Sequence, residues 1–183
     1  TYVMTGASTT PFIVSAYMKG IRGFDIEKAY EGMLKNALPG GIMSKVGYEH
    51  NTNKGGGIEY YIDRGYVPFP LYDKQYGYHQ CGPGVTIEYA YQDWTLAQMA
   101  KALNKMSDHK MLQKRASNYR NIYDSSSGWM RARTLDGNWI EPFDPLVYEN
   151  DYKDPLGSGF VEATAAAATW FVPHDLAGLA DLM

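Results

Sequence analysis

The sequence predicts an all-α fold in which helices follow one another in pairs. Apolar residues recur at helical spacing in several separate segments, and one helix, over residues 86–103, is apolar almost all round. An amphipathic helix follows it directly. Pairs of this kind form two concentric rings, so we expect about half of an (α/α)6 toroid, with long loops and a small β-hairpin. A helical solenoid is the competing architecture, although no short repeat supports it.

The first part of the chain predicts two helices and a long loop. The first helix covers about residues 9–19, with Thr9 or Thr10 as its N-cap. Asp25 caps the second helix, which ends before Pro39. Residues 40–84 are rich in glycine and proline and predict mostly loop, with a short helical turn over residues 58–64. A loop of this length inside a domain usually carries function.

The helix over residues 86–103 is expected to be buried on most sides. Glu88, Gln92 and Thr95 form a narrow polar stripe along it, which faces either water or a polar cavity. The next helix, over residues 107–123, has one apolar face and is otherwise charged. It is therefore the outer partner of the buried helix.

The last third of the chain begins with an expected hairpin. Residues 128–133 alternate like a strand, and Asp136-Gly137 is a turn signal before Trp139 starts the return. Residues 160–171 are apolar and alanine-rich, and a break at residues 172–175 precedes a final helix.

Composition excludes several classes of protein. The 183 residues are 45% hydrophobic and 20% charged, which indicates one globular domain. With 17 basic and 20 acidic residues there is no basic excess for binding nucleic acid. No apolar run approaches the roughly 20 residues of a membrane span. The single cysteine, Cys81, excludes an internal disulfide and a zinc site built on several thiolates.

Aromatic residues make up 14% of the chain, with 16 Tyr and 4 Trp. These side chains combine a flat apolar body with a polar edge, which suits amphipathic ligands such as sugars. On composition alone, a core with polar edges is the better interpretation. Trp129, Trp139 and Trp170 are each either a sugar platform or part of the core.

The termini suggest that residues 1–183 are an internal fragment of a larger protein. The chain starts at Thr1 without a leader and ends at Met183 inside an apolar helical pattern. Cutting a closed ring of helices exposes the apolar side chains that its missing helices would cover. We expect such exposed side chains at both ends of the chain: Phe12, Ile13 and Val14 at one end, and Leu176, Leu179 and Leu182 at the other.

Carboxylates are the best candidates for chemistry. Glu162 lies between Phe160 and a run of four alanines, and an apolar setting would keep it protonated near neutral pH, as a general acid requires. An equally good interpretation is a glutamate at a helix N-terminus. Asp175 is more simply an ordinary first-turn carboxylate. None of the four histidines is paired at helical spacing, so we expect no histidine metal site.

Sequence blocks throughout the chain resemble glycoside hydrolase family 92. The order and spacing of these blocks make the resemblance specific. They include Met43-Ser44-Lys45, Gly47-Tyr48-Glu49-His50, Gly55-Gly56-Gly57, Thr86-Ile87-Glu88-Tyr89-Ala90-Tyr91, Asn118-Tyr119-Arg120-Asn121, Gly128-Trp129-Met130-Arg131, Gly159-Phe160-Val161-Glu162 and Val172-Pro173-His174-Asp175.

The resemblance implies an exo-acting, inverting, calcium-dependent α-mannosidase, mostly bacterial and extracytoplasmic, that acts on mannose-containing glycans. It implies that the chain is the middle of an (α/α)6 catalytic domain that packs on an N-terminal β-sandwich. Glu162 matches the family's general acid. The resemblance implies that the general base, in a Gly-Asn-Asp/Glu-Asp type motif, and the main calcium ligands lie downstream of Met183. It also implies a sugar-holding Trp-Asp-x-x-Arg segment upstream.

Five further residues are expected to contact substrate under this resemblance: His79, Glu88, Trp170, His174 and Asp175. His79 and Glu88 flank the start of the buried helix, at the rim where loops of a toroid form the pocket. The sequence departs from the family at Ala163-Thr164, where Gly-Asn or Ala-Asn is usual. A glycan-binding toroid without catalytic activity is the alternative function, and a helical interaction module is a third.

Overall fold

The computed structural model describes residues 6–41, 56–73, 77–79, 81–148, 159–160 and 162–183. About half of them are helical. The helices are α1 (Thr9–Met18), α2 (Ile26–Asn36), α3 (Ile58–Arg64), α4 (Gly82–Ala102), α5 (Met106–Arg115), the 3-10 helix η2 (Asn118–Ile122), α6 (Ala165–Ala168) and α7 (Leu176–Ala180). Two antiparallel ribbons pair β1 (Leu71–Asp73) with β2 (Gly77–His79) and β3 (Tyr123–Asp124) with β4 (Trp129–Met130).

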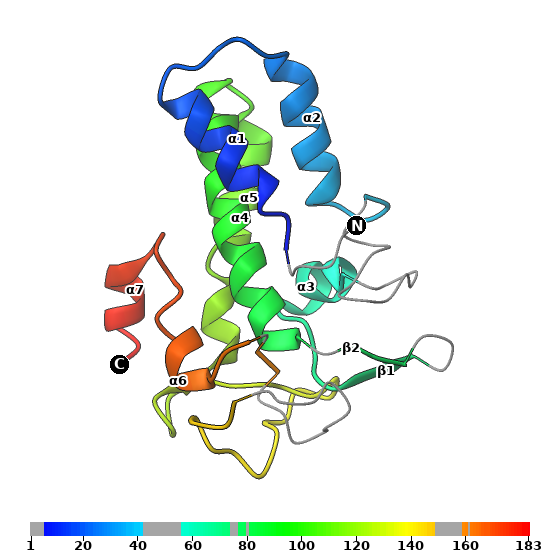
Figure 1. Cartoon of the computed structure of the whole chain (residues 1–183), viewed down its shortest axis with the longest axis vertical. Helices are drawn as coiled ribbons and strands as arrows, with labels where there is room; N and C mark the ends of the chain where they lie inside the picture. Colours follow the sequence, from blue (N-terminus) through cyan, green and yellow to red (C-terminus); the bar gives the residue numbers. More distant parts are fainter. Residues whose placement is uncertain (1–5, 42–55, 74–76, 80, 149–158, 161) are drawn as a thin grey trace.

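Helix α4 is the centre of the molecule, as its apolar sequence predicts. It runs along the long axis with α5 beside it, while α1 packs near its C-terminal end and α6 lies near its N-terminal end (Figure 1). It contributes buried residues to three core clusters, among them Ile87 and Ala90, then Leu96 and Met99, and finally Tyr89. None of the helices in the described part of the chain is both long and apolar enough to span a bilayer.

The N-terminal helices agree with the expected positions. Asp25 caps α2, since its Oδ1 accepts a hydrogen bond of 3.0 Å from the Lys28 amide. The expected cap at Thr9 or Thr10 is wrong, because both lie inside α1; Ser8 occupies the N-cap position, and its side chain makes no capping hydrogen bond.

Helix α4 begins at Gly82, one turn before the start that its apolar pattern indicates. Pro83 falls in the first turn, where a missing N–H costs no hydrogen bond. Gly82 is held by close backbone packing, since a Cβ there would lie 2.6 Å from the Val67 carbonyl oxygen. The two residue types that predict a loop are thus the ones that fit this helix start.

The outer helix expected over residues 107–123 ends at Arg115. The carbonyl oxygens of Arg115 and Ala116 accept hydrogen bonds from the Tyr61 hydroxyl (2.8 Å) and from Nε2 of His174 (2.9 Å). Side chains from distant segments therefore replace the next turn of helix. The chain then tightens into η2 and turns into β3.

The strand predictions are confirmed in part. The turn at Asp136-Gly137 closes with a 2.8 Å bond from the Thr134 amide to the Asn138 carbonyl and a bridge between Arg133 and Trp139. However, β4 pairs with β3 instead. The β1–β2 hairpin lies in the region expected to be mostly loop, and its three-residue strands are too short to show an alternating pattern.

Candidate functional site

A pocket of about 160 Å³ lies at the N-terminal end of α4. It is lined by Gly84, Ile87, Glu88, Phe160, Ala163, Ala168 and Phe171. Glu88 is the one ionisable residue of this lining, and the rest is apolar or aromatic. The volume is below the roughly 300 Å³ at which pockets enclose a drug-sized ligand, so the pocket suits one part of a larger ligand.

Glu88 is half-buried at the wall of this pocket. Burial raises the pKa of its carboxyl group, and a hydrogen bond from Gln92 partly offsets the rise. A carboxylate accepts hydrogen bonds from hydroxyl groups, and a protonated carboxyl group also donates one. The Glu88 carboxyl group is therefore placed to bind a hydroxyl group of a ligand in this pocket.

Phe160 and Ala163 also line the pocket, and the backbone just before Phe160 is anchored to α4. The Gly84 amide donates a 3.5 Å hydrogen bond to the Gly159 carbonyl. Gly159 is left-handed, with φ +73°, and a Cβ there would lie 2.9 Å from Pro83 Cδ. Phe160 is fully buried. The backbone at Gly159 is therefore attached to the first turn of α4.

Glu162 is exposed and lies beside this pocket, next to Ala163 in the sequence. The expected apolar setting is wrong, because Ala165 and Ala168 rather than Glu162 enter the core. The alternative, a glutamate at a helix N-terminus, is also wrong, since Glu162 lies two residues before the N-cap of α6. Helix α6 begins at Ala165, and Thr164 is its N-cap, accepting a 3.1 Å bond from the Ala167 amide.

The backbone of Glu162 is unusual. Its φ is +50°, in the left-handed region that residues other than Gly, Asn and Asp rarely adopt. Among the described residues the other case outside glycine is Asn104, with φ 59°, which directly follows the C-cap of α4, a normal position for asparagine. Glu162 has no such explanation, and strained residues of this kind concentrate at functional sites.

His174 is held in an aromatic setting beside α4. Its ring centroid lies 6.1 Å from that of Tyr91, 6.2 Å from that of Trp94 and 5.7 Å from that of Tyr119. Nε2 donates to the Ala116 carbonyl, while the buried Nδ1 has no hydrogen-bond partner among the described residues. Burial lowers the pKa of His174, so the ring is neutral at pH 7.

Asp175 is engaged by three donors. Its carboxylate accepts from the Tyr119 hydroxyl (2.6 Å), from the Gly178 amide (3.0 Å) and from Arg120 Nη2 (3.2 Å). The Tyr119 bond is the main cause that lowers the pKa of Asp175. The residue is the N-cap of α7. Its contact with a sugar stays a prediction.

The remaining two expected substrate contacts are His79 and Trp170. His79 ends β2, three residues before α4, and its side chain lies outside the described residues. Trp170 follows α6 and is 58% exposed. Phe171, which the sequence did not single out, lines the pocket and packs edge-on against Tyr91 at 5.8 Å. Its position next to Trp170 in an apolar run gave no signal of this role.

The polar stripe of α4 borders the pocket at Glu88, and its other two residues are buried. Gln92 and Thr95 are each 6% exposed. Gln92 Oε1 accepts a 2.9 Å hydrogen bond from the Ala7 amide, and the Thr95 hydroxyl donates to the Tyr91 carbonyl at 2.8 Å. The N-terminal segment covers this part of the stripe, and Glu88 alone borders the pocket.

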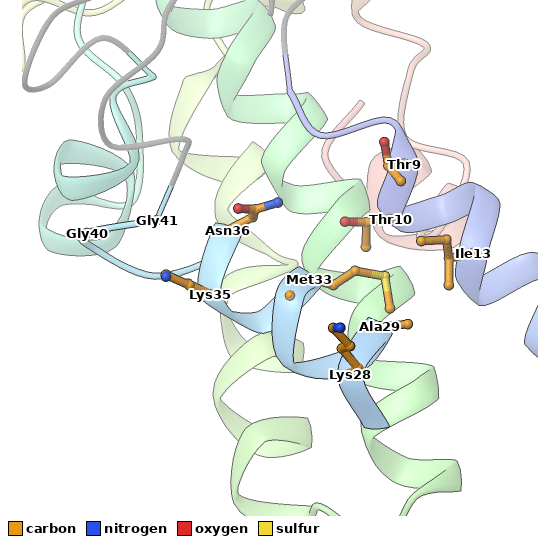
Figure 2. Close-up of a pocket in the computed structure, with 11 residues that line it drawn as sticks. Thr9, Thr10, Ile13, Lys28, Ala29, Met33, Lys35, Asn36, Gly40 and Gly41 are labelled. Atoms are coloured by element: carbon orange, nitrogen blue, oxygen red, sulfur yellow. The ribbon is translucent and has the colours of Figure 1, made fainter. Parts of the chain in front are cut away.

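A second hollow, of about 600 Å³, opens between α1 and α2. Figure 2 shows Thr10 and Ile13 of α1 facing Met33 and Lys28 of α2 across it. None of the residues that line it is Asp, Glu or His, so it offers no group for acid–base chemistry at neutral pH.

The described residues contain no group of three or more His, Cys, Asp or Glu side chains that would hold a metal ion.

The chain resembles several solved enzymes over nearly its whole length. An inverting mannosidase of family GH92 from Bacteroides thetaiotaomicron is 33% identical, with a TM-score of 0.79, and the match covers 98% of this chain and 22% of that one. An α-mannosidase of the same family and organism is 30% identical, with a TM-score of 0.78, over 99% and 21% of the two chains. The latter enzyme is also known in complex with mannoimidazole.

A curated relative, an uncharacterised secreted glycosidase of Arthroderma benhamiae, is 24% identical over 209 residues, which cover all of this chain and 25% of the relative. The chain thus spans about a quarter of that protein and about a fifth of the bacterial enzymes. These bacterial structures have an (α/α)6 catalytic domain, so the predicted fold class is confirmed, with two small β-ribbons added.

The sequence profile of the glycosyl hydrolase family 92 catalytic domain matches residues 1–183. Since that match extends over the whole sequence, the chain belongs to glycosyl hydrolase family 92.

Proposed function

We propose that the chain is part of the catalytic domain of an inverting exo-α-mannosidase that releases mannose from mannose-containing glycans. Two members of its family with the same fold are named as mannosidases, one of them inverting. The observation in this chain that carries the proposal is the exposed, left-handed Glu162 beside a pocket that Glu88 lines.

In the proposed reaction, Glu162 is the general acid. It gives its proton to the glycosidic oxygen while the bond from that oxygen to the anomeric carbon breaks. A base from outside residues 1–183 takes a proton from water, whose oxygen attacks the anomeric carbon from the opposite face. Inversion requires the two carboxyl groups to lie roughly 6.5–9.5 Å apart, which leaves room for the water.

The pocket holds the sugar in this proposal. Phe160 and Phe171 supply apolar surface, and the Glu88 carboxyl group binds hydroxyl groups. His79, Trp170, His174 and Asp175 are proposed as weaker contacts at the rim.

We propose that calcium is held by residues outside this chain, and no step above depends on it. The complete enzyme should lose turnover when a chelator such as EDTA removes calcium, and should recover it when calcium is returned. Full activity of the dialysed, chelator-treated enzyme would contradict this.

The family resemblance also leads us to propose a longer protein with an N-terminal β-sandwich and an extracytoplasmic location. The naming of the fungal relative as a secreted glycosidase supports the location.

The test of the catalytic assignment is Glu162→Gln in the complete enzyme. Loss of the proton should lower turnover of an alkyl mannoside, which has a poor leaving group, by about 10²–10⁴-fold. An activated aryl mannoside needs little protonation and should be affected much less. Glu27→Gln is the control, since this carboxylate on α2 is 62% exposed.

Near-wild-type rates of Glu162→Gln on both substrates would rule out the assignment. A wild-type protein that binds mannosides without hydrolysing them would instead support the alternative of a glycan-binding module.

A further inference from the structure

We infer that Gln92 is a positioning residue, which the N-terminal segment orients so that it holds the Glu88 carboxyl group at the sugar pocket. The inference rests on the proposed function. It joins three parts of the chain that are distant in sequence: residues 6–7, the middle of α4 and the pocket at the start of α4.

The orientation of the Gln92 amide follows from its partners. Gln92 is buried, and its Oε1 accepts a 2.9 Å hydrogen bond from the Ala7 backbone amide, 85 residues away. A backbone N–H only donates, so the oxygen of the side-chain amide faces Ala7. Nε2 therefore faces the other way, where it donates a 3.4 Å hydrogen bond to Oε2 of Glu88.

The N-terminal segment fits closely against this pair. Gly6 is left-handed, with φ +73°. A Cβ at Gly6 would lie 2.3 Å from Nε2 of Gln92 and 3.2 Å from Cβ of Glu88. The segment thus leaves no room for Gln92 to move to another rotamer on that side.

This arrangement leaves one carboxylate oxygen of Glu88 for a ligand. Oε2 is engaged by Gln92, whereas none of the described residues hydrogen-bonds to Oε1. Because Glu88 lines the pocket, Oε1 is the atom that would meet a sugar hydroxyl. Holding the carboxyl group in one rotamer before the sugar arrives reduces the ordering entropy lost on binding.

The experiment uses the complete enzyme and compares Gln92→Leu with Gln98→Leu. Gln98 lies on the same helix, and its Nε2 donates to the carbonyl of Trp94, so it is a matched control. Gln92→Leu should raise the KM for 4-nitrophenyl α-mannoside, and the Kd for methyl α-mannoside in calorimetry, about 5–10-fold. The kcat should stay within about twofold, because binding is lost equally in the ground and transition states.

A second pair of variants tests the contact without changing Gln92. Gly6→Ala pushes on the Gln92 amide and should reproduce the rise in KM. Gly20→Ala is its control, since Gly20 has φ +88° and nothing lies within 4 Å of the added Cβ. Both substitutions place an alanine in a left-handed backbone conformation and so cause similar strain. A higher KM for Gly6→Ala than for Gly20→Ala therefore reports the contact with Gln92.

A double-mutant cycle links Gln92 to Glu88. Glu88→Gln alone should raise KM at least as much as Gln92→Leu, and the double variant should be no worse than Glu88→Gln, because residues that act through one another are not additive. Additive effects, or a Gln92→Leu enzyme indistinguishable from Gln98→Leu, would overturn the inference.

The outcomes separate this inference from the proposed function. If the wild type binds methyl α-mannoside but does not hydrolyse the aryl mannoside, the mannosidase proposal is wrong. The Kd values of the Gln92→Leu and Gln98→Leu variants for methyl α-mannoside then still test the role of Gln92. A wild type that neither binds nor hydrolyses these mannosides overturns both.

Discussion

At the scale of single residues, Glu162 and Asp124 show opposite uses of a carboxylate. Glu162 is exposed in a backbone conformation that costs about 1–2 kcal/mol for most L-residues. Asp124 is buried and accepts from Ser126 Oγ (2.6 Å), the Ser126 amide (3.0 Å) and Arg131 Nη1 (2.8 Å). The left-handed backbone of Glu162 destabilises the fold at the candidate site, whereas the hydrogen bonds of Asp124 stabilise it.

Asp124 should make stability depend on pH. Burial alone would raise the pKa of its carboxyl group, but the bonds from Ser126 and Arg131 lower that pKa from 3.8 to about 2. Because the folded value lies below the unfolded one, the contribution of Asp124 is present above about pH 4 and is lost as pH falls toward 2. Asp124→Asn should therefore lower the free energy of unfolding of the complete protein by about 2–3 kcal/mol at pH 7.

Urea unfolding at pH 7 and at pH 3 measures this difference, which should shrink at the lower pH. Asp63→Asn, at an exposed position on α3, is the control and should change little at either pH. A difference for Asp124→Asn that is equal at both pH values would show that the ionised carboxylate is not the cause.

At the scale of elements, a buried ion pair connects α4 to the end of α5. Arg115 Nε and Nη2 donate to Asp93 Oδ2 and Oδ1 at 2.7 and 2.6 Å. Tyr61 of α3 joins them, with its hydroxyl on the Arg115 carbonyl. Burial raises the pKa of Asp93 to about 6, and the Arg115 guanidinium limits that rise. The pair is therefore ionised at pH 7.

Arg115→Met should destabilise the complete protein by about 3–5 kcal/mol at pH 7, because it leaves the Asp93 charge buried without its partner. Thermal or urea unfolding measures the loss. The double variant Asp93→Leu with Arg115→Met should recover part of it, since no charge is then left buried. Lys105→Met is the matched control. Its partner Glu27 is 62% exposed, so removing that ion pair should change stability little.

A loss for Arg115→Met no larger than that for Lys105→Met would mean that the buried pair does not fasten α4 to α5.

At the scale of the whole molecule, the apolar flanks are only partly those that the sequence indicated. Phe12 is 76% and Leu176 64% exposed, as expected, but Val14 and Leu179 are buried in core clusters. Ile13 and Leu182 are partly buried against the same clusters.

Residues 1–183 expressed alone should therefore self-associate and hydrolyse no mannoside. Exposed apolar patches of several hundred Å² are unusual on soluble monomers, and in our proposal the general base comes from outside residues 1–183. Analytical ultracentrifugation should show association, and Phe12→Ser with Leu176→Ser should reduce it. A monodisperse monomer with a sharp, cooperative melt would show that this stretch folds as a domain by itself, contrary to the half-ring interpretation.

Much of the fold is predictable from local sequence. Asp25 and the residues after it define α2, glycine at 65 ends α3, and the apolar residues of α4 mark it as the central helix. These features depend on hydrogen bonds and side-chain spacing within a few residues, so one segment contains the whole signal.

The carboxylates of the candidate site are predictable in identity but not in setting. The resemblance of sequence blocks indicates Glu162, and the polar stripe of an otherwise apolar helix indicates the Glu88 that lines the pocket. The exposure of Glu162 is not predictable in the same way, because it depends on which alanines of residues 165–168 enter the core.

The helical class, the paired helices, the family and the carboxylates of interest are thus all present in the order of the amino acids. The packing of the folded chain sets where α5 ends, which side of α4 borders the pocket, and how Ala7 orients Gln92. These last features depend on hydrogen bonds between groups that are 54, 58 and 85 residues apart in the chain. The spacing of residues within one segment does not indicate such contacts, because each segment has the same local sequence pattern whether or not the distant partner is present.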